Sequence, residues 1–330
     1  MKVIDHGAGG AAECMRLEER PVPGPGAGEV LIEVAFAGIN RPDVLQRMGL
    51  YLPPPDAFPL LGLEVSGRIA ALGDGVKGLQ VGDKVAALVH GGGYAEYCIA
   101  DAGQVLPIPA GLELKIAAVL PETWFTVWSN MIHHGRLKAG ERLLVHGGAS
   151  GIGMTALQLA KHLGVESFAT VTGDDQARFC REFGASATID YTTQDFGEEV
   201  KRLTAGEGVD VVLDIIGAPY LQRNLDVLRK DGRLVFIGFL GGSKGEADML
   251  PVLFKRLTIT GSTLRPRTAA EKRVIRDDLL KHIWPAYGRG ELQTHLYATF
   301  PLAEVGEAHR LMESNRHIGK IALEVNASLA

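Results

Sequence analysis

Between Arg142 and Thr260 the sequence alternates short apolar runs with longer segments of helical periodicity. Six runs have the length and composition of buried strands, and helices fit between the first five of them. Parallel neighbouring strands need a long crossover connection, which is usually a helix. The alternation therefore predicts an α/β fold with a doubly wound parallel sheet. The expected strands are Arg142 to His146, Glu166 to Val171, Ala187 to Asp190, Asp210 to Ile215, Arg233 to Gly238 and Leu257 to Thr260.

Both ends of the chain have a different pattern. The N-terminal part is rich in Gly and Pro and has runs with the alternating periodicity of half-buried strands, which predicts a compact, partly closed β domain. The runs are Glu29 to Gly38, Glu64 to Ala71, Lys84 to Val89 and Tyr94 to Ile99. The elements expected after the sheet are a helix over Ala269 to Ile283, a run over Leu292 to Phe300, a helix over Leu302 to Ser314 and a strand over Lys320 to Val325.

Charge and composition favour small-molecule partners. The 330 residues carry a formal net charge of −5 and no run of Lys and Arg, which argues against binding to nucleic acid or to a membrane surface. No apolar run reaches the roughly 18 residues of a membrane span, and the N-terminus lacks the apolar core of a secretory signal. The three cysteines, Cys14, Cys98 and Cys180, lie far apart in the sequence and form no C-x-x-C pair. This spacing is typical of a protein in a reducing compartment. We therefore expect a cytoplasmic protein.

A glycine-rich turn, HGGASGIGM, follows the first strand of the predicted sheet. In the dinucleotide fingerprint G-x-G-x-x-G, the first Gly makes a tight turn, the second admits the pyrophosphate and the third lets helix and strand pack closely. These places fall on Gly148, Ser150 and Gly153, with Gly151 beside the substituted position. The pyrophosphate is expected at the N-terminus of the helix that begins near Ile152, with the backbone N–H groups from Ser150 to Gly153 as donors.

The end of the second strand is expected to select between NAD and NADP. An acidic residue there binds the ribose 2′-hydroxyl of NAD, whereas cations accommodate the 2′-phosphate of NADP. The sequence offers Asp174, Asp175 and Arg178, so the two signals conflict. Alternatively, Asp174 is the N-cap of the following helix.

Six segments resemble, in order and spacing, the zeta-crystallin-like NAD(P)H quinone oxidoreductases of the medium-chain dehydrogenase/reductase superfamily. The resemblance covers nearly the whole chain and implies a GroES-like catalytic domain at residues 1–121 and 264–330, a Rossmann domain at 122–263, and an active cleft between the domains. The segments are AGINRPDVLQRMGLY from Ala37, LLGLEVSG from Leu60, GGGYAEY from Gly91, VHGGASGIG from Val145, GSTLRPR from Gly261 and HIGKIALEV from His317.

The resemblance also implies a reductase without a metal. Zinc alcohol dehydrogenases of the same superfamily hold their catalytic zinc with a Cys, a His and a Cys, but Asn40 and Leu63 stand in the first two places here. No Cys lies near residues 121–128, where the third ligand would come. Because Leu cannot bind a metal, we expect no zinc. Without a Lewis acid the acceptor must take hydride readily, as a quinone or an activated double bond does.

By resemblance, Asn40 and Tyr51 line the acceptor pocket and bind a quinone oxygen, with Asp43 in support. Simpler roles remain open, because Asn40 can cap a turn and Asp43 can cap a short helix over residues 44–48. The expected activity is NAD(P)H-dependent quinone reduction. One alternative is reduction of activated C=C bonds in enones, alkenals or enoyl thioesters, with Tyr51 as proton donor. A second is a non-catalytic, crystallin-like NADPH-binding protein.

The resemblance also assigns residues to the cofactor. They are Thr126 near the nicotinamide, Ser150, Gly151 and Ile152 at the pyrophosphate, Thr172 and Tyr191 near the adenosine, Gly217 and Phe239 in later loops, and Lys320. Relatives usually carry a Ser and then a Lys where this chain has Asp174 and Ala177 followed by Arg178. Because an Asp repels a phosphate, we expect NADPH to be favoured with weakened discrimination against NADH.

The last predicted strand of the sheet, Leu257 to Thr260, is apolar and lies at a sheet edge. An exposed apolar edge invites pairing with another chain unless it is covered. Pairing across a twofold axis would cover it, so a homodimer or a dimer of dimers is expected.

Overall fold

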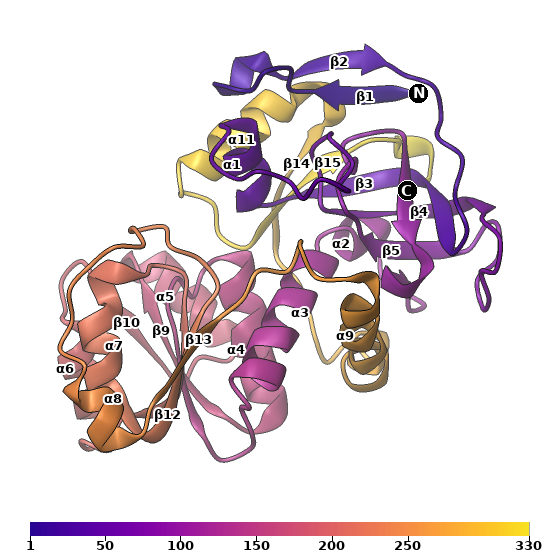
Figure 1. Ribbon diagram of the computed structural model, residues 1–330. Coiled ribbons are helices and arrows are strands. Elements are labelled where there is room, and N and C mark those ends of the chain that lie inside the picture. Colours follow the sequence, from indigo (N-terminus) through magenta and orange to yellow (C-terminus); the bar gives the residue numbers. More distant parts are fainter. Residues whose placement is uncertain (330) are drawn as a thin grey trace. The chain divides into compact units, whose positions relative to one another are not determined.

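The computed structural model describes residues 1–329, and the chain divides into two compact units (Figure 1). Unit 1 combines Met1–Phe125 with the segment that begins at Arg265, and unit 2 is Thr126–Leu264. The two ends of the chain therefore share one unit, while its middle forms the other.

Unit 2 contains a six-stranded parallel sheet, which confirms the predicted fold class. Its strands follow the order β10-β9-β8-β11-β12-β13, so the chain changes direction between β8 and β11. In open α/β sheets, ligands bind outside the carboxyl ends of the strands at such a switch point. The strands are β8 (Arg142–Val145), β9 (Glu166–Val171), β10 (Ala187–Asp190), β11 (Val209–Asp214), β12 (Leu228–Phe236) and β13 (Thr258–Gly261).

Helices connect the strands of unit 2, and the longest of them follows the glycine-rich turn. It ends at Leu163, because the next residue, Gly164, adopts a left-handed conformation with φ of 69° that a residue without Cβ adopts at little cost. Phe168, Val212 and Leu234 lie in the apolar core of the unit. The helices are α4 (Gly151–Leu163), α5 (Gly173–Glu182), α6 (Phe196–Leu203), α7 (Leu221–Val227) and α8 (Leu250–Lys255), with shorter turns at η3 (Ser129–His134) and η4 (Ala218–Tyr220).

Unit 1 is built on a seven-stranded mixed sheet, to which the C-terminal segment contributes two strands. In Figure 1 the yellow strands β14 and β15 lie beside the indigo strand β3, and β15 pairs antiparallel with it, Leu323 opposite Ala37. The order is β14-β15-β3-β4-β5-β7, and β6 also pairs with β3. The strands are β3 (Glu29–Ile39), β4 (Glu64–Leu72), β5 (Lys84–Leu88), β6 (Tyr97–Asp101), β7 (Val105–Pro107), β14 (Leu296–Pro301) and β15 (Lys320–Glu324).

One strand of unit 1 differs from its prediction. The alternating pattern from Tyr94 suggested a strand ending at Ile99, but β6 begins only at Tyr97. The preceding residues turn instead, since the Tyr94 amide donates to the carbonyl of Leu61. The sequence analysis also missed a small two-stranded sheet, β1 (Lys2–Asp5) with β2 (Arg16–Glu19).

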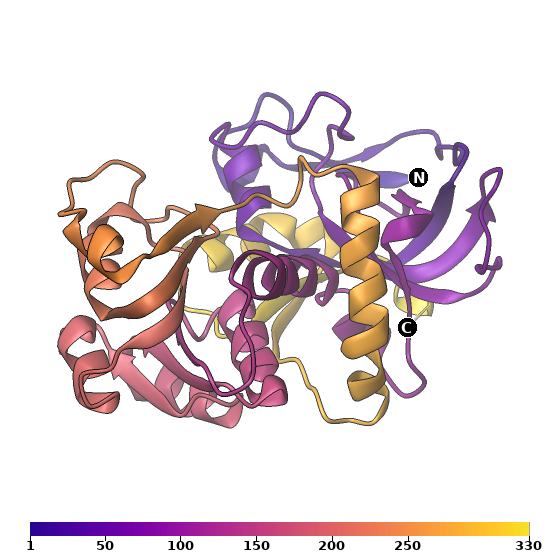
Figure 2. The same cartoon turned by 60° about the horizontal axis from the view of Figure 1, so that its bottom comes forward.

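Helices pack around the sheet of unit 1, and Figure 2 shows the orange helix α9 beside the purple strands. None of the helices among residues 1–329 is long and apolar enough to cross a membrane. The helical segments are α1 (Arg41–Arg47), α2 (Leu114–Ala117), α9 (Ala269–His282), α10 (Trp284–Gly288) and α11 (Val305–Glu313), the turns η1 (Ala12–Cys14), η2 (Ala102–Gln104), η5 (Leu302–Glu304) and η6 (Ala327–Leu329), and α3 (Pro121–Trp128), which continues into unit 2.

Candidate active site

A buried cluster in unit 1 holds the side chain of Asn40 in one orientation. The amide oxygen of Asn40 accepts a hydrogen bond from Lys320 Nζ at 2.5 Å, and its Nδ2 donates to Glu64 Oε1 at 2.9 Å. Lys320 Nζ also donates to Glu64 Oε1 at 2.8 Å and to the carbonyl of Ile39 at 3.3 Å. All three protons of the ammonium group are therefore used within unit 1. A contact between Lys320 and the cofactor, as expected by resemblance, would require one of these bonds to break.

Two carboxylates near Asn40 were not singled out in the sequence. Glu64 is fully buried, and its Oε2 accepts the backbone N–H of Glu122 at 2.8 Å. Burial, followed by the nearby charge of Glu64, raises the pKa of the partly buried Glu122 carboxyl to about 8. Glu122 is therefore largely protonated at neutral pH. The sequence signal was a charged residue inside an apolar strand, LLGLEVSG, which indicates a buried partner for Glu64.

Asp43 does not cap a helix over residues 44–48 but belongs to the capping box of α1, whose N-cap is Asn40. It is the third residue of α1, which begins at Arg41 rather than at residue 44, and its Oδ2 accepts the backbone N–H of Asn40 at 2.9 Å. Its other oxygen accepts the N–H of Gly62 at 3.0 Å. Burial raises the pKa of this carboxyl to about 6. Asp43 is fully buried, so in unit 1 it supports the backbone of Asn40 instead of facing an acceptor.

Tyr51 lies in an exposed loop and has a cationic neighbour. The Arg265 guanidinium lies 6.0 Å from the centre of the Tyr51 ring and is held by Gln46 Oε1 at 2.5 Å and by the carbonyl of His90 at 3.3 Å. Burial raises the pKa of the Tyr51 phenol, while Arg265 opposes this shift. Arg265, from the GSTLRPR segment, is a third residue, after Glu64 and Glu122, that the sequence did not single out. It supplies a fixed positive charge near the phenol.

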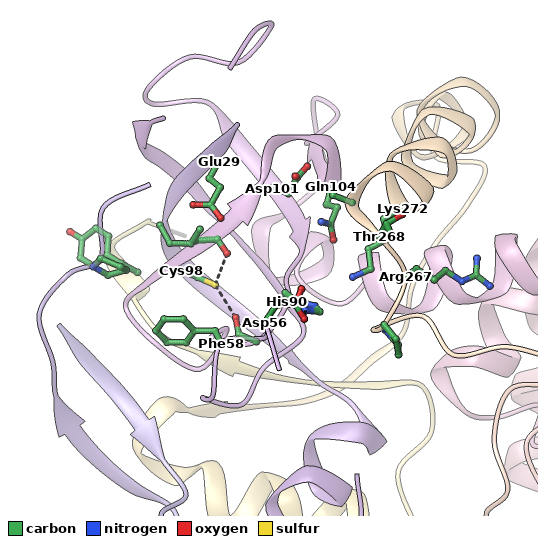
Figure 3. Close-up of a pocket in the computed structure, with 17 residues that line it drawn as sticks. Glu29, Asp56, Phe58, His90, Cys98, Asp101, Gln104, Arg267, Thr268 and Lys272 are labelled. Atoms are coloured by element: carbon green, nitrogen blue, oxygen red, sulfur yellow. Dashed lines mark hydrogen bonds and ion pairs between the residues drawn. The ribbon is translucent and has the colours of Figure 1, made fainter. Parts of the chain in front are cut away.

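Unit 1 also has a cavity of about 380 Å³, shown in Figure 3. Its wall includes His90, Lys272 and Gln104, with Asp56 beside His90. Lys272 is almost fully buried and donates to the carbonyl of Arg265 at 2.9 Å. Neither Asn40 nor Tyr51 lines this cavity. The cavity is connected to the neighbourhood of Tyr51 through Arg265, which binds both Lys272 and the carbonyl of His90.

In the glycine-rich turn of unit 2, the roles of the individual glycines differ in part from those predicted. The tight turn is made by Gly147, with φ of 70°, and not by Gly148. A Cβ on Gly148 would lie 2.6 Å from Ala169 Cβ and 2.8 Å from Cys180 Sγ, so this glycine permits close packing. Gly153 has the role predicted for the third glycine, because a Cβ there would meet the carbonyl of Gly147 at 2.5 Å.

The hydrogen bonds of Ser150 explain why a serine stands in the turn at a place where the fingerprint has a glycine. Its side chain caps α4 by accepting the N–H of Gly153 at 3.0 Å, and it donates to the carbonyl of Gly147 at 2.8 Å. The first amides of a helix have no acceptor within the helix, which leaves Gly151 and Ile152 as donors for an anion. The set of phosphate donors is therefore narrower than the predicted run from Ser150 to Gly153.

At the end of β9, two residues expected near the adenosine lie together. Thr172 Oγ1 donates to the Tyr191 hydroxyl at 3.0 Å. Arg178 is exposed and its guanidinium pairs with Asp175 Oδ1 at 3.1 Å. Asp174 lies in the first turn of α5 and is not its N-cap, which is Thr172. An acidic group in the first turn stabilises the helix, so this effect explains Asp174 without any contact to a cofactor.

The other expected cofactor residues follow later elements. Gly217, with φ of 90°, lies against Phe239, since a Cβ on Gly217 would meet the ring at 2.5 Å and the carbonyl of Gly242 at 2.6 Å. The two loops after β11 and β12 therefore touch at this point. Thr126 lies on α3, where its carbonyl accepts bonds from Ser129 and Asn130.

Two family models match the two parts of the fold. Residues 26–110 match the alcohol dehydrogenase GroES-like domain, and residues 151–277 match the zinc-binding dehydrogenase domain. A 2-haloacrylate reductase from Burkholderia sp. is 32% identical over 332 residues, which cover 98% of each chain. The chain belongs to the medium-chain dehydrogenase/reductase superfamily.

Solved structures of this superfamily have the same fold and bind nicotinamide cofactors. The quinone oxidoreductase of Escherichia coli complexed with NADPH has a TM-score of 0.87 and 27% identity, covering 98% of this chain and all of that one. An NAD-dependent alcohol dehydrogenase has a TM-score of 0.88 and 30% identity, covering 99% and 100%. This chain is thus similar both to a structure complexed with NADPH and to one described as NAD-dependent.

Other superfamily relatives are parts of much larger proteins. The chain is 31% identical over 320 residues to a phenolphthiocerol/phthiocerol polyketide synthase of Mycobacterium tuberculosis. The match covers 96% of this chain but only 14% of that protein.

The residues present do not fit the zinc ion that one family model implies. Residues 1–329 contain no group of three or more His, Cys, Asp or Glu side chains placed to hold a metal. Asn40 and Leu63 occupy the two ligand places, and the Asn40 oxygen is already bonded to the ammonium of Lys320. A metal cation beside that ammonium would be repelled. The glycine-rich turn of unit 2, by contrast, fits a pyrophosphate through the free amides that begin α4.

Proposed function

We propose that this chain is a zinc-independent NADPH:quinone oxidoreductase. The observation that supports it best is the fixed amide of Asn40. Lys320 binds its oxygen and Glu64 binds one of its N–H groups, which leaves the second N–H as a donor with a fixed direction. A quinone oxygen is an acceptor suited to that donor.

Three side chains of unit 1, those of Asn40, Arg265 and Tyr51, then have a role in the reduction. The nicotinamide supplies a hydride when it is bound. Addition of hydride to a quinone leaves negative charge on its oxygen, which a preorganised donor or a nearby cation stabilises. Asn40 Nδ2 donates to that oxygen, Arg265 provides positive charge near Tyr51, and the Tyr51 hydroxyl can deliver the one proton that completes the hydroquinone.

A steady-state panel tests the proposal. NADPH and NADH are each combined with ortho-quinones, para-quinones, enones and alcohols, and cofactor oxidation is followed by absorbance. We expect the highest kcat/KM with a quinone and NADPH, and none with alcohols, because no metal polarises them. Faster turnover of enones than of every quinone would contradict the quinone assignment. Semiquinone detection by electron paramagnetic resonance separates one-electron from two-electron reduction.

Reduction of an activated C=C bond is the second candidate, supported by the likeness to 2-haloacrylate reductase over almost the full length of both chains. This reaction needs a proton on carbon, whereas a hydroquinone oxygen exchanges protons with water. Tyr51→Phe therefore discriminates between the candidates. A loss of about tenfold or more in enone reduction with little change for quinones would favour the C=C reductase.

A further inference from the structure

Four buried polar side chains of unit 2 form a continuous hydrogen-bonded chain across the switch point between β8 and β11. They are Thr170, His146, Asn224 and Asp214, and none is more than 1% exposed. Thr170 Oγ1 lies 3.2 Å from His146 Nδ1, and His146 Nε2 lies 2.8 Å from Asn224 Oδ1. Asn224 Nδ2 donates to Asp214 Oδ2 at 2.8 Å. We call these four residues the switch-point chain.

Each end of the switch-point chain holds the backbone of a different loop. Thr170 Oγ1 accepts the N–H of Gly147, in the turn after β8, at 3.1 Å. Asp214 Oδ1 accepts the N–H groups of Ile216 and Gly217, in the loop after β11, at 2.5 and 3.2 Å. The two loops that flank the switch point are therefore joined through His146, the first residue of the turn after β8, and through three side chains that lie outside both loops.

The direction of every bond follows from the ionised carboxylate of Asp214, which can only accept. Asn224 must present its NH₂ group to Asp214, so its oxygen faces His146 and accepts from Nε2–H. A neutral histidine with a proton on Nε2 has a bare Nδ1, which accepts the hydroxyl proton of Thr170. Burial lowers the pKa of His146 to about 4 and keeps it neutral, with Asn224 opposing the shift and Arg223 adding to it.

We propose that Thr170, His146, Asn224 and Asp214 are positioning residues that hold the turn at Gly147 and the loop at Gly217 at the spacing that the dinucleotide requires. This proposal depends on one part of the proposed function, namely that NADPH binds at the switch point of unit 2. No member of the chain needs to touch the cofactor. Breaking one link leaves a buried donor or acceptor unpaired and frees one loop from the other.

An exchange of two residues provides the sharpest test. Asp214→Asn sets two NH₂ groups against each other, and Asn224→Asp sets two carboxylates against each other across 2.8 Å. In the double variant D214N/N224D, the carboxylate at position 224 accepts from His146 and from the amide at position 214. The oxygen of that amide accepts the N–H groups of Ile216 and Gly217. Every donor then has an acceptor again.

The readout is the Kd of NADPH, measured by quenching of protein fluorescence without any acceptor. We expect each single variant to weaken NADPH about tenfold or more, and the double variant to return to within about threefold of the natural chain. With a quinone that the natural chain reduces, KM for NADPH should rise more than kcat falls, because the side chains act on binding.

If the D214N and N224D variants do not fold, variants of two buried threonines test the proposal instead. Thr170→Val removes the link to Gly147, and Thr170→Ser should restore it. Thr204→Val is the matched control, since Thr204 is also buried and accepts a glycine amide, that of Gly208, at 2.9 Å near the amino end of β11. It should lower the melting temperature without changing the Kd of NADPH.

The proposal is wrong if folded D214N, N224D or T170V binds NADPH within twofold of the natural chain. It is also wrong if the double variant fails to recover affinity, or if T204V weakens NADPH as much as T170V. Failure of the natural chain to bind NADPH would overturn it as well. If the Kd pattern is as expected but no quinone is reduced, the switch-point chain is supported and the proposed function is not.

Discussion

Asn40 is the residue on which the proposed reduction depends most directly. Asn40→Asp keeps the size of the side chain and its bond to Lys320 but removes both N–H donors. We expect kcat/KM for a quinone to fall about tenfold or more, because a hydrogen bond to a charged group is worth about 1.5–3 kcal/mol. The Kd of NADPH and the melting temperature, measured on the same sample, show whether the loss is specific. Unchanged kcat/KM would remove Asn40 from the acceptor site.

Arg178 is the residue that bears on cofactor preference. Its guanidinium is exposed and pairs with Asp175, so it must leave that partner to bind a 2′-phosphate. We expect Arg178→Ala to lower kcat/KM for NADPH by about threefold to tenfold, a modest effect because exposed charge pairs contribute little. Turnover of NADH should be unaffected. Arg202→Ala is the control, since Arg202 is equally exposed and pairs with Glu199 in the same i, i+3 geometry. An equal loss with both cofactors would refute the assignment.

His309 makes folding stability depend on pH. It is fully buried beside Tyr94, and burial, followed by the charges of Arg47 and His6, lowers its pKa to about 3. The unfolded chain binds its proton near pH 6.5, so below that pH the unfolded state gains protons that the folded state lacks. The free energy of unfolding then falls by about 1.4 kcal/mol per pH unit from this group as the pH drops from 6.5.

Urea denaturation between pH 7 and pH 4.5 measures this contribution. His309→Gln should flatten the fall of unfolding free energy with decreasing pH by roughly the slope of one proton. His162→Gln, at an exposed position of α4, is the matched histidine control. Equal slopes for the natural chain and His309→Gln would show that His309 is not held neutral.

At the scale of elements, the start of α4 depends on the absence of a side chain at Gly153. A methyl group there would overlap the carbonyls of Gly147 and Gly148 and force the turn away from the helix. We expect Gly153→Ala to weaken NADPH about tenfold or more, because the turn and the helix together present the phosphate donors. Gly306→Ala is the control, since this glycine in α11 has its nearest contact at 3.4 Å. NADPH affinity within twofold of the natural chain would contradict this reading of the turn.

The strands of unit 2 were predictable because a buried parallel strand is an uninterrupted apolar run between turn signals. The bounds of β9 and β10 agree with the prediction, β8 ends one residue early, and β11 is shifted by one residue at both ends. Strand β12 begins at Leu228, five residues before its predicted start. Unit 1 was harder to predict. Its strand β6 begins three residues late, because backbone bonding to Leu61, far away in the sequence, overrides the local alternation.

At the scale of the whole molecule, the exposed apolar side chains of unit 2 lead us to expect that two copies of the chain associate. Leu253 and Phe254 of α8 are 73% and 74% exposed, and Ile259 lies on the edge strand β13. We expect a homodimer through this surface, because an unpaired edge with exposed apolar side chains is covered in most soluble proteins. The double variant L253D/F254D should be monomeric by light scattering at micromolar concentration. V274D, at an exposed apolar position of α9 in unit 1, should remain dimeric. A natural chain of monomeric mass would refute the expectation.

The sequence by itself determined the parallel sheet, the glycine-rich turn after its first strand and the superfamily. The sheet and the turn depend on periodicity and on backbone freedom within a few consecutive residues, whereas the superfamily follows from the resemblance of six segments spread along the chain.

Only the tertiary structure decided which side chains act together. Lys320 meets Asn40 across 280 residues of sequence, Asp43 supports the backbone of Asn40, and the tight turn falls on Gly147 instead of Gly148. The switch-point chain likewise joins residues from β9, the turn after β8, α7 and β11. Such partnerships are set by strand order and by the pairing of buried polar groups, and no local pattern in the sequence records which distant group will satisfy them.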